Sequence, residues 1–215
     1  MNIKHDILDL LSYIEPDISN FPVYSIKILS LLTQTCIAME SLFKSILKAN
    51  KFQLSNREKM DIKIYSRLDK THKLSDFSVG ISLVLDHIFE PFISFSNSDI
   101  NKISPVFYHA YNASKHDSFG SFKRASFENL LNAFAGLFVV HVSVSGIGFD
   151  TDPAAILPKI REIDVDGIKV KIDSYESKTN SFFNLVGTPS WSDEQRYDVD
   201  WGSITDKSSY KNLDI

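Results

Sequence analysis

The sequence has almost no cysteine and lacks the glycine-rich loops of common nucleotide-binding enzymes. Only one of its 215 residues is a cysteine, Cys36, so no disulfide can form within the chain, which fits a reducing compartment. We find no GxGxxG fingerprint, no Walker A loop and no Gly-x-Ser-x-Gly nucleophile elbow. The sequence therefore gives no signal for a dinucleotide enzyme, a P-loop NTPase or an α/β-hydrolase.

Metal ligands and long apolar runs are also scarce. No closely spaced set of cysteines and histidines predicts zinc, and Asp198 with Asp200 offers too few oxygens for a hard metal ion. We expect no metal and no cofactor. The most apolar run, Leu130–Ser145, contains Asn132 and His141 and is shorter than the roughly 20 residues of a membrane span. We expect a buried core helix, no membrane contact and, without an apolar secretory signal at the start, a cytoplasmic protein.

Charge of one sign does not dominate the first part of the chain. The net charge is −4, but residues 148–215 hold thirteen acids and eight bases, whereas residues 1–147 hold fourteen acids and fifteen bases. Neither part is basic enough to bind nucleic acid by charge alone. An anionic partner is expected to approach residues 1–147.

Helical periodicity is the main structural signal. Helices are predicted over residues 2–15, 23–49, 57–73, 78–89, 105–117 and 124–145. The clearest is 23–49, where apolar residues recur in steps of three and four and Cys36 lies within the apolar stripe as a packed thiol. Glu40 lies four residues later, at the edge of the stripe. The simpler interpretation pairs it with Lys44 in solvent, and the alternative turns it into a cleft between helices.

The composition changes after Gly146, and this divides the chain into a helical bundle at 1–147 and a C-terminal part at 148–215. Asp166-Gly167 is a preferred hairpin turn, and pairing across it sets Val165 opposite Ile168 and Glu162 opposite Lys171. Residues 182–186 are a candidate third strand. The alternating aromatic and acidic residues 197–201 predict an extended tail. The fold class is therefore mainly α, with a small C-terminal β-hairpin and a tail packed on the bundle.

The predicted helix 105–117 carries the candidate site. Tyr108, Asn112 and His116 are spaced by four residues, and His109 joins the same side of the helix. Such a polar face makes a poor core, so it either meets solvent or lines a site. Two interpretations of His116 remain open: it caps the helix and binds Asn112, or it serves a function with its neighbours.

The segment Tyr111-Asn-Ala-Ser-Lys-His-Asp117, followed by the apolar helix Leu130–Val144, resembles a HEPN-type domain. The long helix carrying Glu40 and the tail at 197–201 are also similar to bacterial HEPN-like proteins. The resemblance covers residues 22–146 and implies an antiparallel helical bundle that dimerises across its motif helices. Many members are metal-independent RNases of toxin–antitoxin, phage-defence and RNA-decay systems. Possible partners are therefore RNA, a second copy of the chain, and an antitoxin or other defence-operon protein.

The resemblance implies transesterification by the RNA 2′-hydroxyl. His116 matches the family histidine and would move the proton, Lys115 would stabilise charge on the phosphate, and Asn112 would orient the phosphate or the ring. Tyr111, His109, Asp117 and Glu40 complete the candidate set as substrate-binding residues.

The family motif also has an arginine that is separated from the histidine by four to six residues, and Tyr111, Ala110 and His109 stand at those positions in this chain. The alternative hypothesis is therefore a non-catalytic helical module that binds a partner protein or a nucleotide. A small-molecule enzyme working between helices is a third possibility, supported only by the clustering of His109 and His116.

Overall fold

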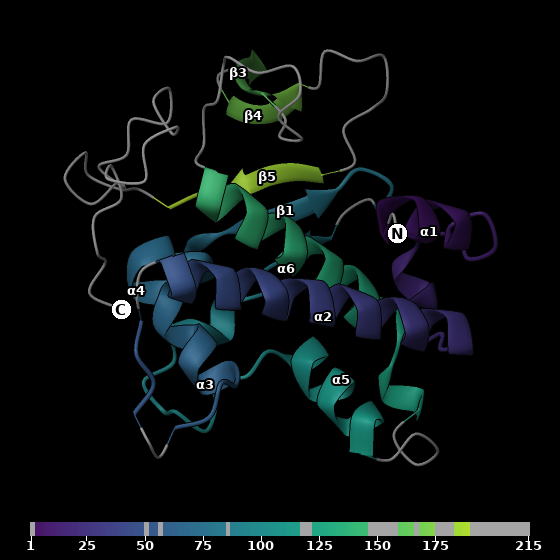
Figure 1. Ribbon diagram of the computed structural model, residues 1–215. Helices are drawn as coiled ribbons and strands as arrows, with labels where there is room; N and C mark the ends of the chain where they lie inside the picture. Colours follow the sequence, from purple (N-terminus) through teal and green to yellow (C-terminus); the bar gives the residue numbers. More distant parts are fainter. Residues whose placement is uncertain are drawn as a thin grey trace.

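The computed structural model describes residues 3–189, except 50–51, 56–57, 85–86, 117–121, 146–158, 166–167 and 175–182. The fold is mainly helical with a small antiparallel sheet (Figure 1). Its α-helices are α1 (Ile3–Leu10), α2 (Ile26–Ala49), α3 (Ile62–Tyr65), α4 (Asp69–His72), α5 (Val106–His116) and α6 (Phe127–Ser145). Its strands are β1 (Ser78–Ile81), β2 (Ile88–Phe89), β3 (Lys159–Val165), β4 (Ile168–Ser174) and β5 (Phe183–Gly187). Short 3-10 turns are η1 (Ile18–Asn20), η2 (Ser66–Leu68), η3 (Leu74–Asp76), η4 (Ile93–Ser96) and η5 (Phe122–Arg124).

Helices α2 and α6 pack against each other and form the centre of the core. The predicted stripe of α2 is buried from Leu32 through Cys36 and Met39 to Phe43. A Cβ added at Gly136 of α6 would lie only 3.1 Å from the Met39 methyl carbon, so glycine permits the close approach of the two helices.

Among the described residues, α2 and the Phe127–Val144 part of α6 are long and apolar enough to cross a membrane by length and composition alone. From the sequence, only the run Leu130–Ser145 of α6 was considered as a span, and it was expected to be too short. Of the stretch in α6, 67% is buried inside the fold, compared with 39% of the corresponding stretch in α2.

A three-stranded antiparallel sheet in the order β2-β1-β5 covers part of α6. The prediction of a helix over 78–89 was wrong. Val79 and Ile81 are buried while Gly80 is half-buried between them, which is the alternation of a strand. The partner strand β5 comes from the far end of the chain, and its Phe183 ring stacks on Phe138 of α6 with ring centroids 4.5 Å apart. The predicted third strand therefore exists.

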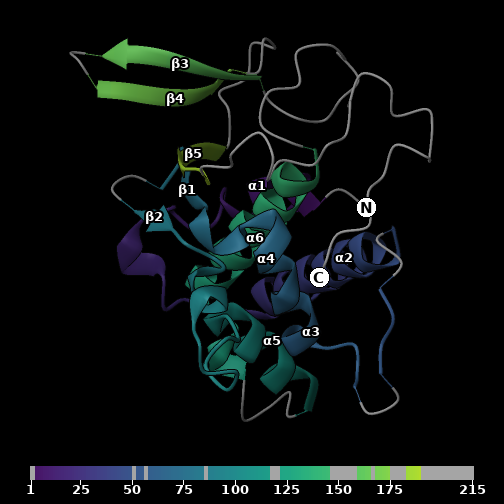
Figure 2. The same cartoon turned by 90° about the vertical axis from the view of Figure 1, so that its left-hand side faces the viewer.

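The β3–β4 hairpin has the predicted register, with Val165 opposite Ile168 and Glu162 opposite Lys171. It lies beside β5, at the end of the molecule opposite α5 (Figure 2). The Asp166-Gly167 turn, the predicted boundary near residue 147 and the tail at 197–201 lie outside the described residues.

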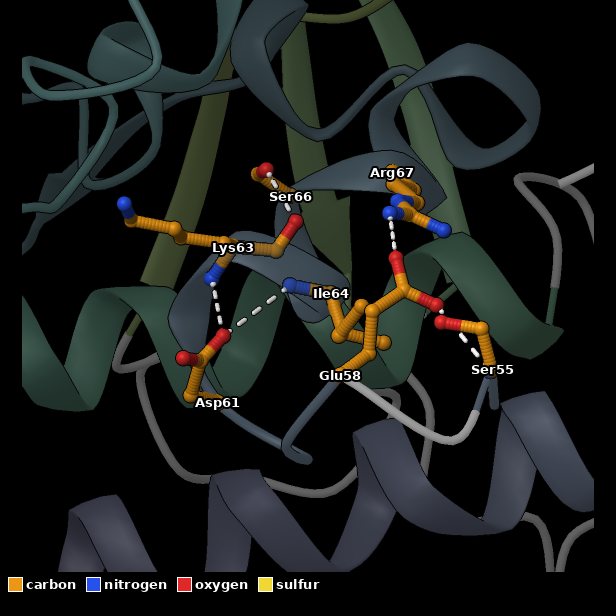
Figure 3. A network of polar contacts seen from close by, with 7 residues as sticks. All are labelled: Ser55, Glu58, Asp61, Lys63, Ile64, Ser66 and Arg67. Atoms are coloured by element: carbon orange, nitrogen blue, oxygen red, sulfur yellow. Dashed lines mark hydrogen bonds and ion pairs between the residues drawn. The ribbon is translucent and has the colours of Figure 1, made fainter. Parts of the chain in front are cut away.

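The predicted helix 57–73 is instead two short helices, α3 and α4, joined by a 3-10 turn. Asp61 caps α3, because its carboxylate accepts the backbone N–H of Lys63 at 2.9 Å (Figure 3). Glu58 accepts the backbone N–H of Ser55 at 3.1 Å and binds Arg67, so it ties the preceding loop to the turn (Figure 3).

Candidate functional site at the contact between α2 and α5

Helix α5 lies beside α2 and buries a mixed aromatic face. The helix starts after Pro105, whose carbonyl accepts the backbone N–H of His109 at 3.1 Å. Phe107, Tyr108, Ala110 and Tyr111 are buried. The predicted polar face is therefore divided: Tyr108 belongs to the core, Asn112 is half-buried and His109 is exposed.

Glu40 of α2 binds this face of α5. The Tyr108 hydroxyl donates a hydrogen bond to Glu40 Oε1 at 2.8 Å, and Lys115 Nζ lies 3.8 Å from the same oxygen. Lys44 Nζ lies 3.7 Å from Oε2. The Glu40 side chain is only 17% exposed. The predicted pair with Lys44 exists, but its placement in open solvent was wrong, because contacts with α5 cover the carboxylate.

The ammonium group of Lys115 also lies over an aromatic ring. Its Nζ is 3.8 Å from the centroid of Tyr111, a cation–π contact that adds to the attraction of Glu40. The three residues Tyr108, Tyr111 and Lys115 follow one another along α5 in steps of three and four, so they share the face that meets α2. Lys115 is thereby held at the end of α5 while 43% of its side chain remains exposed.

The hydroxyls and the thiol around Glu40 remain protonated. Burial, followed by the carboxylate of Glu40, raises the pKa of Tyr108 and of Tyr111 above the ordinary value. The same two causes raise the pKa of Tyr65, which stacks on Phe43 with ring centroids 5.1 Å apart. Tyr108 is therefore available at neutral pH as a donor to Glu40.

Cys36 lies one helical turn before Glu40 and is fully buried. Burial and the nearby carboxylate raise the pKa of its thiol, so it stays neutral and is a poor nucleophile. The sequence prediction of a packed thiol agrees with this position.

The structure brings together three of the predicted site residues, Glu40, Tyr111 and Lys115. His116 is the last residue of α5, and its side chain is outside the described part of the structure, as is all of Asp117. His109 and Asn112 lie on α5, with no hydrogen bond or ion pair to Glu40 among the described contacts.

The pattern placed Tyr108 on the candidate face and paired Lys44 with Glu40, but neither was assigned a role in the site, and Tyr65 was not predicted there. The spacing of Tyr108 from Lys115 was an available signal, because seven residues are two turns of a helix. The sequence contains no such signal for Tyr65, because the residues around it depend on how α3 packs against α2.

The described residues include no group of three or more histidine, cysteine, aspartate or glutamate side chains able to hold a metal ion. The ammonium groups of Lys44 and Lys115 lie on either side of the mostly covered Glu40 carboxylate. Two positive charges and one negative charge leave the cluster with a net charge of about +1. Such a surface suits a single anionic group such as a phosphate. No family model, curated protein or solved structure matches this chain.

Proposed function

We propose that this chain is a HEPN-like cytoplasmic protein that binds RNA at the end of α5 and cleaves it without a metal. The observation that supports the proposal is the fixed position of Lys115. Glu40 and the Tyr111 ring hold the ammonium group of Lys115, the residue that precedes His116 in the sequence, with part of the lysine side chain open to solvent. A cation and an imidazole are two groups that RNA transesterification can use.

In the proposed reaction, the RNA 2′-oxygen attacks the adjacent phosphorus and the bond from phosphorus to the 5′-oxygen breaks. The 2′-hydroxyl proton passes to a neutral His116, and the 5′-oxygen takes a proton as it leaves. Lys115 stabilises the additional negative charge on the phosphate, and Asn112 orients it. A homodimer would supply a second His116 as the acid. A toxin or phage-defence role fits such an activity.

The test is incubation of a short single-stranded RNA with the protein in the presence of a chelator. Wild-type protein should produce fragments with 2′,3′-cyclic phosphate ends, and His116→Ala should lose at least a hundredfold of this rate while still binding RNA. His5→Ala, on the separate helix α1, is the matched control and should cleave normally. Equal cleavage by the wild type and His116→Ala would reject the nuclease.

A second candidate is a non-catalytic module in which the same cluster only fixes α5 against α2. It is favoured by the internal partners of Glu40, since the carboxylate already binds Tyr108, Lys44 and Lys115. In that case Lys115→Met should lower the unfolding temperature without changing RNA affinity. Fluorescence anisotropy with labelled RNA, together with thermal unfolding, separates the two functions. Removal of residues 190–215 should then change partner capture or oligomeric state.

A further inference from the structure

We infer that Glu40 competes with a phosphate group for Lys44 and Lys115. In the free protein, the carboxylate of Glu40 binds these two lysines, which would otherwise bind the phosphate. This inference rests on the proposed function for the identity of the natural ligand, the RNA backbone. It does not require cleavage, and it assigns to Glu40 a regulatory role instead of a direct contact with substrate.

The geometry around the carboxylate carries the inference. Lys44 and Lys115 come from different helices, yet their ammonium groups lie 3.7 and 3.8 Å from the two oxygens of one carboxylate. Their side chains are 52% and 43% exposed, whereas that of Glu40 is 17% exposed. An incoming anion therefore meets the lysines first and can draw them outward, while Glu40 stays fixed by Tyr108.

The charge of Glu40 decides whether its removal strengthens or weakens phosphate binding. A phosphate bound to both lysines would lie within several ångströms of the Glu40 carboxylate, and two like charges at such a distance near a protein surface repel each other. Holding two lysine side chains in place saves a comparable or smaller amount of conformational entropy. Removing the negative charge should therefore tighten phosphate binding rather than weaken it.

The groups that face Glu40 identify the matched variants. On α2 these are Cys36 and Lys44, on α5 they are Tyr108, Tyr111 and Lys115, and on α3 it is Tyr65. Glu40→Gln removes the charge and keeps an oxygen that can accept from Tyr108. Tyr108→Phe removes that hydrogen bond and keeps the charge. Asp99→Asn is the control for a general change of net charge, because Asp99 forms an exposed pair with Lys102 elsewhere on the surface.

The experiment measures binding of inorganic phosphate and of a short single-stranded RNA at fixed pH and salt. Glu40→Gln should tighten both about tenfold. Tyr108→Phe, which keeps the negative charge, should not reproduce this gain, and Asp99→Asn should stay within twofold of the wild type. Adding Lys115→Met to Glu40→Gln should remove the gain. An unchanged or weaker affinity in folded Glu40→Gln would overturn the inference.

An alternative measurement and one further outcome keep the test decisive. Should Glu40→Gln fail to fold, NMR of the lysine ammonium groups in the wild type replaces it: added phosphate should shift Lys44 and Lys115 but not Lys102. No shift at the first two would overturn the inference. Tighter phosphate binding without any RNA binding would support the competitor and reject RNA as the ligand, so the two proposals fail separately.

Discussion

Glu40 connects two helices through one partly covered carboxylate. Because a carboxylate strengthens a hydrogen bond, the contact from Tyr108 at 2.8 Å is expected to stabilise the fold by more than a neutral pair would. Lys44 and Lys115 neutralise the charge that remains. The contact of α5 with α2 therefore depends on a polar cluster as well as on apolar packing.

Tyr108→Phe should lower the free energy of unfolding by about 1–3 kcal/mol, because the buried ring stays and only the bond to the carboxylate is lost. Denaturant unfolding followed by circular dichroism measures this. Tyr13→Phe is the control, since Tyr13 is exposed and its loss of a hydroxyl should have little effect. Equal stability of both variants would contradict a stabilising role for this hydrogen bond.

His72 should make the fold sensitive to mild acid. It is buried in α4, and burial lowers its pKa to about 4 from an ordinary value of 6.5. Between these two values the unfolded chain binds a proton that the folded chain does not, so stability falls as the pH is lowered from about 6.5 to about 4. The loss should approach about 3 kcal/mol.

The measurement for His72 is unfolding by urea at pH 7, 6, 5 and 4. The difference between the wild type and His72→Gln should shrink as the pH falls, because the variant cannot lose this contribution. His109→Gln, at an exposed position of α5, should follow the wild type at every pH. A difference in unfolding free energy between the wild type and His72→Gln that stays constant with pH would contradict the lowered pKa of His72.

At the scale of the elements, β5 links the C-terminal part of the chain to the core. Leu185 is buried and Val186 next to it is exposed, so the strand has one inner and one outer face. Leu185→Ala should lower the free energy of unfolding by about 2–5 kcal/mol, and Val186→Ala by much less. Thermal unfolding of these two variants tests whether β5 is packed as part of the core. Similar melting temperatures for both variants would argue that it is not.

The contact between α2 and α6 depends on the small residue Gly136. A side chain there would meet Met39, Phe92 and Pro91, all within 3.1–3.3 Å of an added Cβ. Gly136→Val should cost about 1–3 kcal/mol or more through overpacking. Glu128→Val, at an exposed position of the same helix, is the control for placing a β-branched side chain in α6. Chemical denaturation compares them, and equal losses would contradict close packing here.

Local patterns explain why some elements were predictable and others were not. The apolar periodicity of α2 and α6 extends over many turns, and the Asp166-Gly167 dipeptide fixes the hairpin register locally. The run 78–89 is short and apolar, so its sequence does not distinguish a strand from a helix, and its partner β5 lies at residues 183–187. The same holds for the site. The sequence identified Lys115 and Glu40 as separate candidates, but their contact depends on the packing of α5 against α2 and could not be predicted.

At the scale of the whole molecule, the described fold depends on residues beyond the predicted boundary at 147. A chain ending at residue 182 would lack β5, leaving β1 with β2 alone and the aromatic rings of Phe134 and Phe138 without Phe183. Such a chain should aggregate or unfold cooperatively at a lower temperature than a chain ending at residue 189. Size-exclusion chromatography and calorimetry of the two chains test this, and identical behaviour would favour an independent unit at 1–147.

The pairing of β1 with β5 has a consequence for how the protein is made. Strand β1 leaves the ribosome long before its partner, so the nascent polypeptide must carry an unsatisfied strand edge and uncovered phenylalanines until β5 has been synthesised. Assembly of this sheet has to wait until then. Newly made chains are therefore clients for chaperones during that interval, and a pause in translation shortly before β5 would extend it.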